Sequence, residues 1–215
     1  MRPAGRRRRG ARDHLDMDRV DILAHSAAGD LAILYAARHP QRIRSMTLVA
    51  ARARAIGIDV TVEHRREAVA LRSAEPWFEP ARRAFEAIGW GTRPMPTGAP
   101  SLRSAMADGT LRPRADDASS ADQTNHDAVP VYPATGAFDP DTTRTAIGKL
   151  TAPVLIYAGE LDAAPRPHVA EATARLFPRA EVVVQPGGGH VPWLDDPGHF
   201  TRTVVAFTSA ASGRT

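Results

Sequence analysis

The sequence predicts an α/β fold, in which helices flank a parallel β-sheet, and two observations carry this prediction. In the first, residues 19–25 and 43–49 have the apolar content of short buried strands, and residues 27–39 between them have helical apolar spacing that stops before Pro40. A strand, a helix and a strand within about thirty residues form a βαβ unit, whose two strands run parallel. In the second, the same alternation returns after residue 150.

This second half predicts two more strands and two more helices. Residues 153–159 indicate a buried strand, residues 166–177 a helix and residues 181–185, Glu-Val-Val-Val-Gln, a final strand. The last helix is expected to start at Asp195-Asp196-Pro197, where acidic caps precede a proline in the first turn. Three apolar side chains are expected to pack this helix onto the sheet: Phe200, Val204 and Phe207.

The sequence changes character between the two halves. Residues 60–71 and 80–88 have helical apolar spacing, whereas residues 91–136 are rich in proline, glycine, serine and aspartate. Four aromatic residues are expected to anchor this part by plain packing: Trp77, Phe78, Phe85 and Trp90. We therefore expect an inserted, mostly helical cap or lid that includes a long loop.

The domain organisation follows from these segments. Residues 12–49 and 151–215 are expected to form the α/β core, and residues 50–150 the inserted cap. Residues 1–11, which contain four consecutive arginines from Arg6 to Arg9, match no element and predict a disordered basic arm.

The basic residues do not by themselves indicate a nucleic-acid partner. Of the 28 basic residues, Lys149 is the single lysine, and this arginine bias together with abundant alanine is typical of a high-GC genome. The formal net charge is +4. A basic arm that binds phosphates through Arg6 to Arg9 is one hypothesis, but no interleaved aromatic residues or known reading module accompany it, so we expect no nucleic-acid partner.

Composition also bears on the compartment and on metal sites. The chain has no cysteine, which excludes disulfides, zinc–thiolate sites and a cysteine nucleophile. No run of about 18 apolar residues predicts a membrane span, and no apolar segment follows the basic start as it would in a secretory signal. We expect a cytoplasmic protein with no membrane partner, no metal and no cofactor.

The chemistry-bearing feature of the first half is Ser26. A buried strand ends at this serine, small residues follow, and a helix then begins. A strand, a sharp turn and a helix of this kind push the serine hydroxyl out above the edge of a sheet. The strained turn needs small neighbours, and Ala24, Ala28 and Gly29 supply them. The backbone N–H of Ala27, at the start of the helix, is then a candidate oxyanion donor.

A simpler interpretation of Ser26 is an N-cap, because serine before an apolar helix commonly caps it. The match to the Gly-x-Ser-x-Gly pattern is also incomplete, since Ala24 and Ala28 replace both glycines. The rest of the chain decides between the two interpretations.

Two further side chains follow strands in the second half. Asp162 comes after the strand that ends at Gly159, and His190 follows the last strand in the loop Pro186-Gly187-Gly188-Gly189, which we expect to leave the histidine free to swing. Because the carboxyl ends of parallel strands meet at one edge of a sheet, Ser26, Asp162 and His190 are expected to lie together there. Their chain order is that of a serine, acid and histidine triad.

Several sequence pieces resemble the α/β-hydrolase superfamily. They are Ala-His-Ser-Ala-Ala-Gly, Gly-Ala-Phe-Asp-Pro, Ala-Pro-Val-Leu-Ile-Tyr-Ala-Gly-Glu-Leu-Asp and Gly-Gly-Gly-His-Val-Pro-Trp-Leu-Asp-Asp-Pro. More narrowly, they are similar to the cap-bearing bacterial hydrolases grouped with proline iminopeptidases and small esterases. The resemblance implies that Ser26 is the nucleophile, His190 the general base and Asp162 the residue that orients the imidazole. A serine nucleophile argues against the related epoxide hydrolases and dehalogenases, which use aspartate.

One departure from the family concerns the start of the chain. Family members have several strands before the nucleophile strand and an early loop that supplies a second oxyanion donor, whereas here the nucleophile strand begins at residue 19. We therefore expect an N-terminally truncated α/β-hydrolase fold. Its nucleophile strand would have an unpaired edge, and such an edge favours self-association.

These inferences lead to one main hypothesis and one alternative. The main hypothesis is a serine hydrolase that cleaves a small-molecule ester, or with less support an amide or N-terminal peptide bond, through an acyl-serine intermediate. The alternative is a catalytically impaired remnant of the same fold, or a module that needs a partner, because loss of one oxyanion donor lowers turnover about 100- to 1000-fold.

Overall fold

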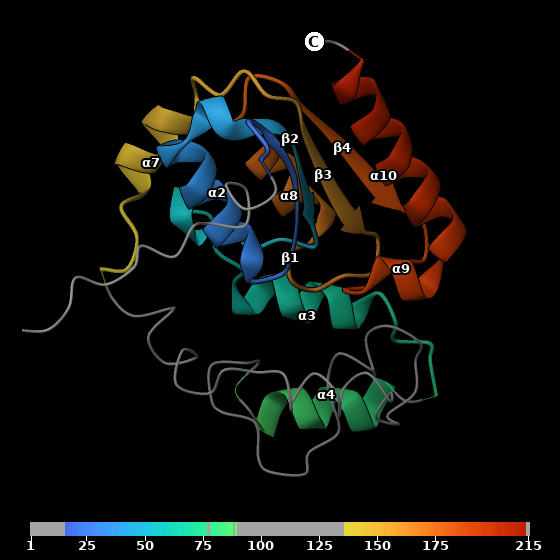
Figure 1. The fold of residues 1–215 in the computed structure, drawn as a ribbon. Helices are drawn as coiled ribbons and strands as arrows, with labels where there is room; N and C mark the ends of the chain where they lie inside the picture. Colours follow the sequence, from blue (N-terminus) through green and yellow to red (C-terminus); the bar gives the residue numbers. More distant parts are fainter. Residues whose placement is uncertain (1–15, 77, 88, 90–135, 214–215) are drawn as a thin grey trace, which may run out of the picture.

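Four parallel strands form the sheet, and their order in space is their order along the chain (Figure 1). They are β1 (Val20–His25), β2 (Ile43–Val49), β3 (Val154–Gly159) and β4 (Ala180–Gln185), and each pairs with its neighbour in parallel. The predicted parallel sheet with flanking helices is therefore confirmed, and each expected strand is present within a residue of its expected bounds.

This computed structural model describes residues 16–76, 78–87, 89 and 136–213. The expected basic arm at residues 1–11, the aromatic residues Trp77 and Trp90, and nearly all of the loop at residues 91–136 lie outside the described residues. No helix in the described ranges has both the length and the apolar character needed to cross a membrane.

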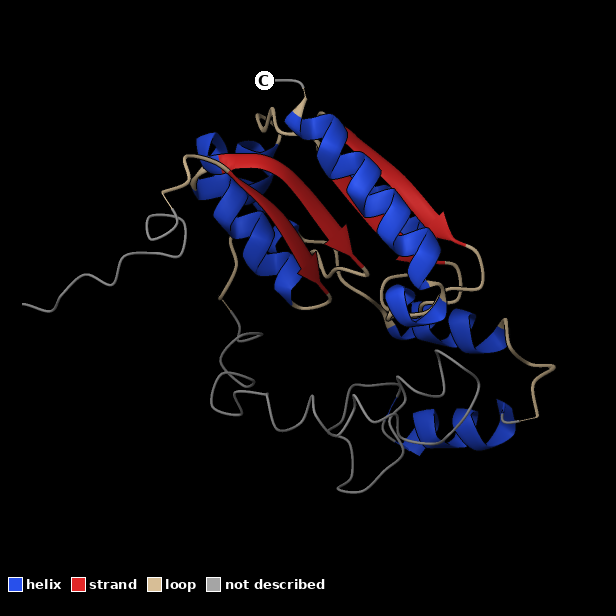
Figure 2. Ribbon diagram, turned by 45° about the vertical axis from the view of Figure 1, so that its right-hand side comes forward, coloured by secondary structure: helices blue, strands red, loops and turns tan. Residues whose placement is uncertain are grey.

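The two faces of the sheet carry different helices, as a comparison of the two ribbon views shows (Figure 2). On one face lie α2 (Ala28–Arg38), α7 (Pro140–Ile147) and α8 (Pro167–Ala174), and on the other lies α10 (Pro197–Ser212). Alternation along β3 explains this division: Val154 and Ile156 belong to the core cluster that also contains α2 and α8 residues, whereas Leu155 and Tyr157 pack with Phe207 of α10.

Local sequence signals set the ends of these helices. The segment α2 ends before Pro40, which begins the short 3-10 helix η1 (Pro40–Arg42). Asp196 caps α10 by accepting a hydrogen bond from the backbone N–H of His199 at 2.8 Å, and Pro197 occupies the first helical position.

Two helices of the expected cap follow β2. The helix α3 (Val62–Ala70) lies beside the carboxyl ends of the strands, and α4 (Phe78–Ala87) follows it (Figure 1). Val69 of α3 and Phe85 of α4 are both buried in one apolar cluster, against which Val62 and Phe78 also pack. The expected anchoring roles of Phe78 and Phe85 are thus confirmed.

Two segments at the ends of the expected insertion pack into the main core instead. They are the 3-10 helix η2 (Arg54–Ile56) and α7, which contributes the fully buried Ile147. Both contact α2, and the buried carboxylate of Asp30 on α2 accepts a hydrogen bond from the backbone N–H of Ala55 at 2.8 Å. The apolar pattern of residues 50–150 indicated buried faces, but it does not specify the element against which each face is buried.

A polar contact joins β1 to β2 near their amino ends. The Asp21 carboxylate accepts hydrogen bonds from Ser45 Oγ at 2.6 Å and from Arg44 Nη2 and Nε at 2.6 and 2.9 Å. Burial alone would raise the pKa of Asp21, but the hydrogen bonds from Arg44 and Ser45 outweigh it and lower the pKa.

We expect Asp21→Asn to reduce the free energy of unfolding by about 1 kcal/mol at pH 7, because a charge-assisted cross-strand contact is lost. The folded-state pKa of Asp21 is depressed, so its contribution is present above about pH 4 and is lost as the pH falls through the folded-state pKa. Urea denaturation at pH 7, 5 and 3.5 should show that the difference in the free energy of unfolding between variant and wild type becomes smaller as the pH falls. Asp18→Asn, at an exposed position 3.9 Å from Arg42, is the matched control and should change little.

Candidate active site

Ser26 sits on a strained turn directly after β1. Its φ angle is +54°, in the left-handed region, which costs a residue with a side chain roughly 1–2 kcal/mol. Three hydrogen bonds hold its backbone: Ser26 N donates to Val49 O at 3.1 Å, and Ser26 O accepts from Gly29 N at 3.0 Å and from Arg52 N at 2.9 Å. The loop after β2 therefore helps to maintain the turn that displays the serine.

The small residues around Ser26 have distinct roles in this turn. A Cβ added to Gly29 would clash with the backbone oxygen of Arg52 and with the Cβ of Ala51, so only glycine lets the first turn of α2 and the loop after β2 pass this closely. Ala24 is buried against the core. The N-cap of α2 is Ala27, with no side-chain cap, so the simple interpretation of Ser26 as an N-cap does not describe its side chain.

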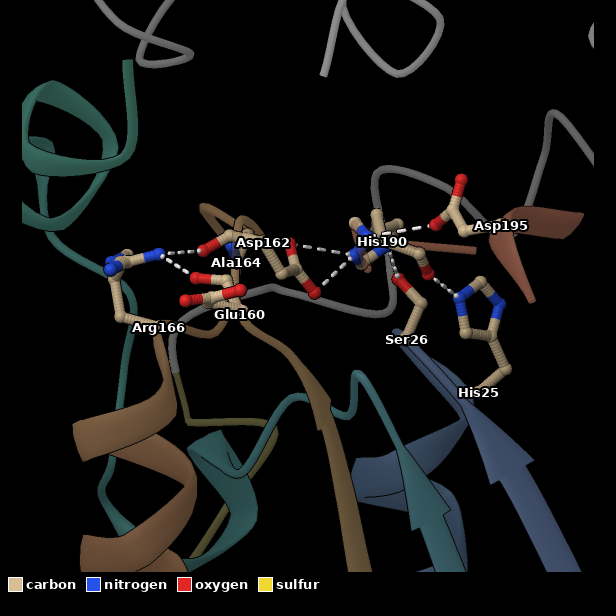
Figure 3. A network of polar contacts seen from close by, with 9 residues as sticks. His25, Ser26, Glu160, Asp162, Ala164, Arg166, His190 and Asp195 are labelled. Carbon is tan, nitrogen blue, oxygen red and sulfur yellow. Dashed lines mark hydrogen bonds and ion pairs between the residues drawn. The ribbon is translucent and has the colours of Figure 1, made fainter. Parts of the chain in front are cut away.

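The Ser26 hydroxyl instead meets His190, and His190 meets Asp162 (Figure 3). Ser26 Oγ lies 3.0 Å from His190 Nε2, and His190 Nδ1 lies 3.0 and 3.2 Å from the two carboxylate oxygens of Asp162. Asp162 is fully buried and His190 is 8% exposed, whereas Ser26 is half-buried. The structure thus brings together all three side chains that the sequence singled out, over distances of up to 164 residues along the chain.

This arrangement fixes the proton positions that are available to the three groups. A carboxylate only accepts hydrogen bonds, so in the neutral imidazole His190 Nδ1–H donates to Asp162 and Nε2 accepts from the Ser26 hydroxyl. Asp162 Oδ1 also accepts from the backbone N–H of Ala164 at 2.8 Å. Chemically, the chain can remove a proton from Ser26 while a buried anion faces the resulting imidazolium.

The loop that carries His190 is held in place, and the expectation that its glycines free the histidine to swing needs correction. Gly187 N donates to Glu160 Oε2 and Gly189 N donates to Asp195 Oδ2, each at 2.8 Å. His25 Nε2 donates to the carbonyl oxygen of His190, also at 2.8 Å. Gly187 takes a φ of +64°, a left-handed conformation that glycine adopts without steric cost, so it serves the turn of the loop.

A buried glutamine, Gln185, lies at the start of the loop that carries His190. Gln185, at the end of β4, donates through Nε2 to Pro192 O at 3.0 Å and accepts at Oε1 from the Tyr157 hydroxyl at 2.5 Å. Burial, with the nearby charge of Asp196, raises the pKa of Tyr157 to about 12, so this hydroxyl keeps its proton. His199 Nδ1 lies 2.8 Å from the same hydroxyl.

The sequence did not identify three residues that support this site. The sequence predicts His25 as the last residue of a strand, and its position next to the serine is a usable signal for a role at the site. The sequence predicts acidic caps at Asp195-Asp196; Asp196 caps α10, whereas the Asp195 carboxylate accepts a hydrogen bond from Gly189 N. The sequence predicts Arg166 as the start of a helix, and it carries no signal for the contacts of Arg166 with the Asp162 loop. Within the described part of the chain, no three histidine or acidic side chains are grouped to hold a metal ion.

With this geometry established, comparison with known proteins identifies the family. Residues 9–197 match the family model described as the alpha/beta hydrolase fold. The chain belongs to the α/β-hydrolase family. No curated protein matches it closely enough in sequence to count as a relative.

Solved structures of hydrolases share this fold. The chain is similar to proline iminopeptidase from Mycobacterium smegmatis, with a TM-score of 0.63, 24% identity, and coverage of 93% of this chain and 68% of that one. It is also similar to a thermophilic esterase from Thermogutta terrifontis (TM-score 0.58, 21% identity, 94% and 69% covered). A third is a meta-cleavage product hydrolase from Pseudomonas fluorescens (TM-score 0.62, 21% identity, 94% and 69% covered). At these identities the likeness shows the fold.

At the end of β3, the loop that carries His190 passes so close to Gly159 that a substitution there tests the packing of this loop. A Cβ added to Gly159 would clash with the carbonyl oxygens of Gly188 and Gly189, which pass directly over it. We expect Gly159→Ala to lower the free energy of unfolding by about 1–3 kcal/mol, because the loop that carries His190 must shift. Urea denaturation followed by circular dichroism measures the change. Gly213→Ala, whose Cβ would meet Ser209 O at an ordinary 3.7 Å, is the control and should be nearly neutral.

Proposed function

We propose that this chain is a serine hydrolase that cleaves a small-molecule ester through an acyl-serine intermediate. An amide or N-terminal peptide bond is the alternative substrate with less support. The observation that carries the proposal is the linked set of hydrogen bonds from Ser26 Oγ to His190 Nε2 and from His190 Nδ1 to buried Asp162. A nucleophile, a base and a buried group that orients the base are the parts such catalysis needs.

In the proposed first half-reaction, Ser26 Oγ attacks the ester carbonyl carbon while its proton passes to His190 Nε2. Asp162 stabilises the imidazolium through Nδ1 and remains ionised. The oxyanion of the tetrahedral intermediate is proposed to accept a hydrogen bond from the backbone N–H of Ala27, which directly follows Ser26 and precedes α2. Collapse of the intermediate expels the alcohol, which takes the proton from His190, and leaves the acyl group on Ser26.

The second half-reaction uses the same groups in reverse. His190 Nε2 removes a proton from a water molecule, whose oxygen attacks the acyl-serine carbonyl. The second tetrahedral intermediate collapses, the carboxylic acid leaves, and Ser26 Oγ regains its proton from His190. The proposed cycle thus uses three side chains and the Ala27 backbone N–H of this chain, together with one water molecule. The left-handed turn at Ser26 supports it, because the turn lifts the hydroxyl clear of the strand.

Ser26→Ala should abolish hydrolysis of a short p-nitrophenyl ester and labelling by a fluorophosphonate reagent, with an unchanged far-UV circular dichroism spectrum. His190→Ala should lose as much, and the double variant no more, because the two groups act as a unit and losses of about 10⁴- to 10⁶-fold do not add. Asp162→Asn should lose less than either. Activity in Ser26→Ala comparable to wild type would contradict the nucleophile assignment.

We further propose that the chain self-associates through β1, and two exposed apolar side chains support this. Among the described strands β1 pairs with β2 alone, so its other edge carries no described strand. Leu23 on β1 is 52% exposed and Leu31 on the neighbouring helix α2 is 57% exposed. An open apolar strand edge favours pairing with another copy.

Light scattering coupled to size exclusion tests this association. The wild type should elute as a dimer or larger species, and Leu23→Lys should shift it toward the monomer, because a charge on the strand discourages edge pairing. Leu71→Lys, at an equally exposed position next to α3, is the matched control and should leave the distribution unchanged. A monomeric wild type would refute the association.

A further inference from the structure

A buried arginine connects the Asp162 loop to the helix α3. Arg166 directly precedes α8 and is 6% exposed. Its Nη1 donates to two backbone carbonyl oxygens, that of Glu160 at 2.7 Å and that of Asp162 at 3.0 Å (Figure 3). One guanidinium nitrogen therefore holds the backbone on which the Asp162 carboxylate is mounted.

The same guanidinium faces a carboxylate on α3. Arg166 Nε lies 3.4 Å from Glu67 Oε1, across 99 residues of sequence. His168 Nδ1 is 3.9 Å from the same carboxylate oxygen, and the His64 ring contacts the His168 ring at 5.0 Å between centroids. Glu67, His64 and His168 are the titratable groups that these contacts place around the arginine.

Burial makes Arg166 dependent on this partner. A guanidinium stays charged at ordinary pH, and a buried charge is costly unless it is paired and hydrogen-bonded. Two carbonyl oxygens satisfy Nη1, and Glu67 supplies the negative charge. Without Glu67, the charged guanidinium is better solvated when the side chain turns toward water. In that position it no longer reaches the two carbonyl oxygens.

A displacement of the Glu160 and Asp162 carbonyl groups would change the hydrogen bond between Asp162 and His190. The Asp162 side chain is held at one oxygen by Ala164 N–H and at both oxygens by His190 Nδ1. A shift of the Asp162 backbone lengthens the contact with His190, and a change of about 1 Å in catalytic geometry can cost roughly 100-fold in rate.

We propose that Arg166 is a positioning residue for Asp162 and that Glu67 holds Arg166 in place, so that the docking of α3 sets the Asp162–His190 hydrogen bond. The expected effect on rate rests on the proposed hydrolase function, whereas the expected effect on the Asp162–His190 hydrogen bond does not. Since α3 lies beside the carboxyl ends of the strands, where the proposed substrate binds, the contact links the cap side of the site to the general base (Figure 1).

Steady-state kinetics with a p-nitrophenyl ester test the effect on rate. Arg166→Gln should lower kcat about 10- to 100-fold and leave KM within about twofold, because the orientation of the base changes but the substrate contacts do not. Glu67→Gln should lower kcat about 3- to 10-fold, and the double variant should match Arg166→Gln, since Glu67 acts through Arg166. Additive losses in the double variant would contradict the proposal.

Matched controls separate this role from general damage. Glu63→Gln removes a carboxylate one turn earlier on α3, 4.0 Å from exposed Arg66. Arg179→Gln removes an arginine that likewise donates to a backbone carbonyl, that of Thr151 at 2.9 Å, on the surface. Both should retain wild-type kcat. If Arg166→Gln fails to fold, Glu67→Gln at its half-exposed position still decides, and wild-type kcat in that variant overturns the proposal.

Proton NMR of the full chain gives a readout that does not need turnover. The His190 Nδ1 proton should give a far-downfield signal, assigned by its loss in His190→Ala, that moves upfield in Arg166→Gln and Glu67→Gln and stays in both controls. An unchanged signal in these two variants, or no such signal in the wild type, overturns the proposal. If the wild type shows the expected signals but neither hydrolyses esters nor reacts with fluorophosphonate, the proposed function fails while the positioning role stands.

Discussion

The pairing of β2 with β3 is the contact on which the rest of the site depends. It joins a βαβ unit that carries Ser26 to a second unit that carries Asp162 and His190, through partners that run from Met46 with Val154 to Val49 with Tyr157. Every residue of β3 and nearly every residue of β2 is buried, so a slip of one residue would turn each apolar set to the wrong face. The register of this ladder therefore fixes the distance between the serine and its two partners.

Close backbone packing converts that register into a defined site. At the carboxyl edge, two loops pass close over elements where glycine removes the side chain: the loop after β2 over Gly29 of α2, and the loop that carries His190 over Gly159 of β3. The carboxylates of Glu160 and Asp195 accept hydrogen bonds from the loop that carries His190, and His25 donates one to it. In the proposed reaction, such packing orients the reacting groups before substrate binds, and preorganisation of this kind supplies much of an enzyme's rate enhancement.

The three site side chains also differ in burial in a way that suits their chemistry. Asp162 is fully enclosed and hydrogen-bonded, so its charge is exposed to little solvent and acts mainly on His190. His190 lies between interior and surface, and Ser26 remains half-exposed at the edge of the sheet. In the proposed reaction, the accessible Ser26 hydroxyl is the group that meets solvent and substrate, and the buried Asp162 carboxylate lies at the other end of the hydrogen-bonded chain.

The sequence by itself determined the strands, most helices and the three candidate site residues, because each depends on local signals. Apolar segments ended by proline or glycine mark the elements, and Ser26, Asp162 and His190 each follow a strand whose carboxyl end must lie at the same edge. Only the tertiary structure decided that α7 packs into the core, that His25 and Asp195 hold the His190 loop, and that Arg166 joins Asp162 to Glu67. These contacts connect elements that are up to 165 residues apart, or they depend on the rotamer of one side chain. A periodic pattern indicates that a face is buried, but it does not indicate which element covers that face.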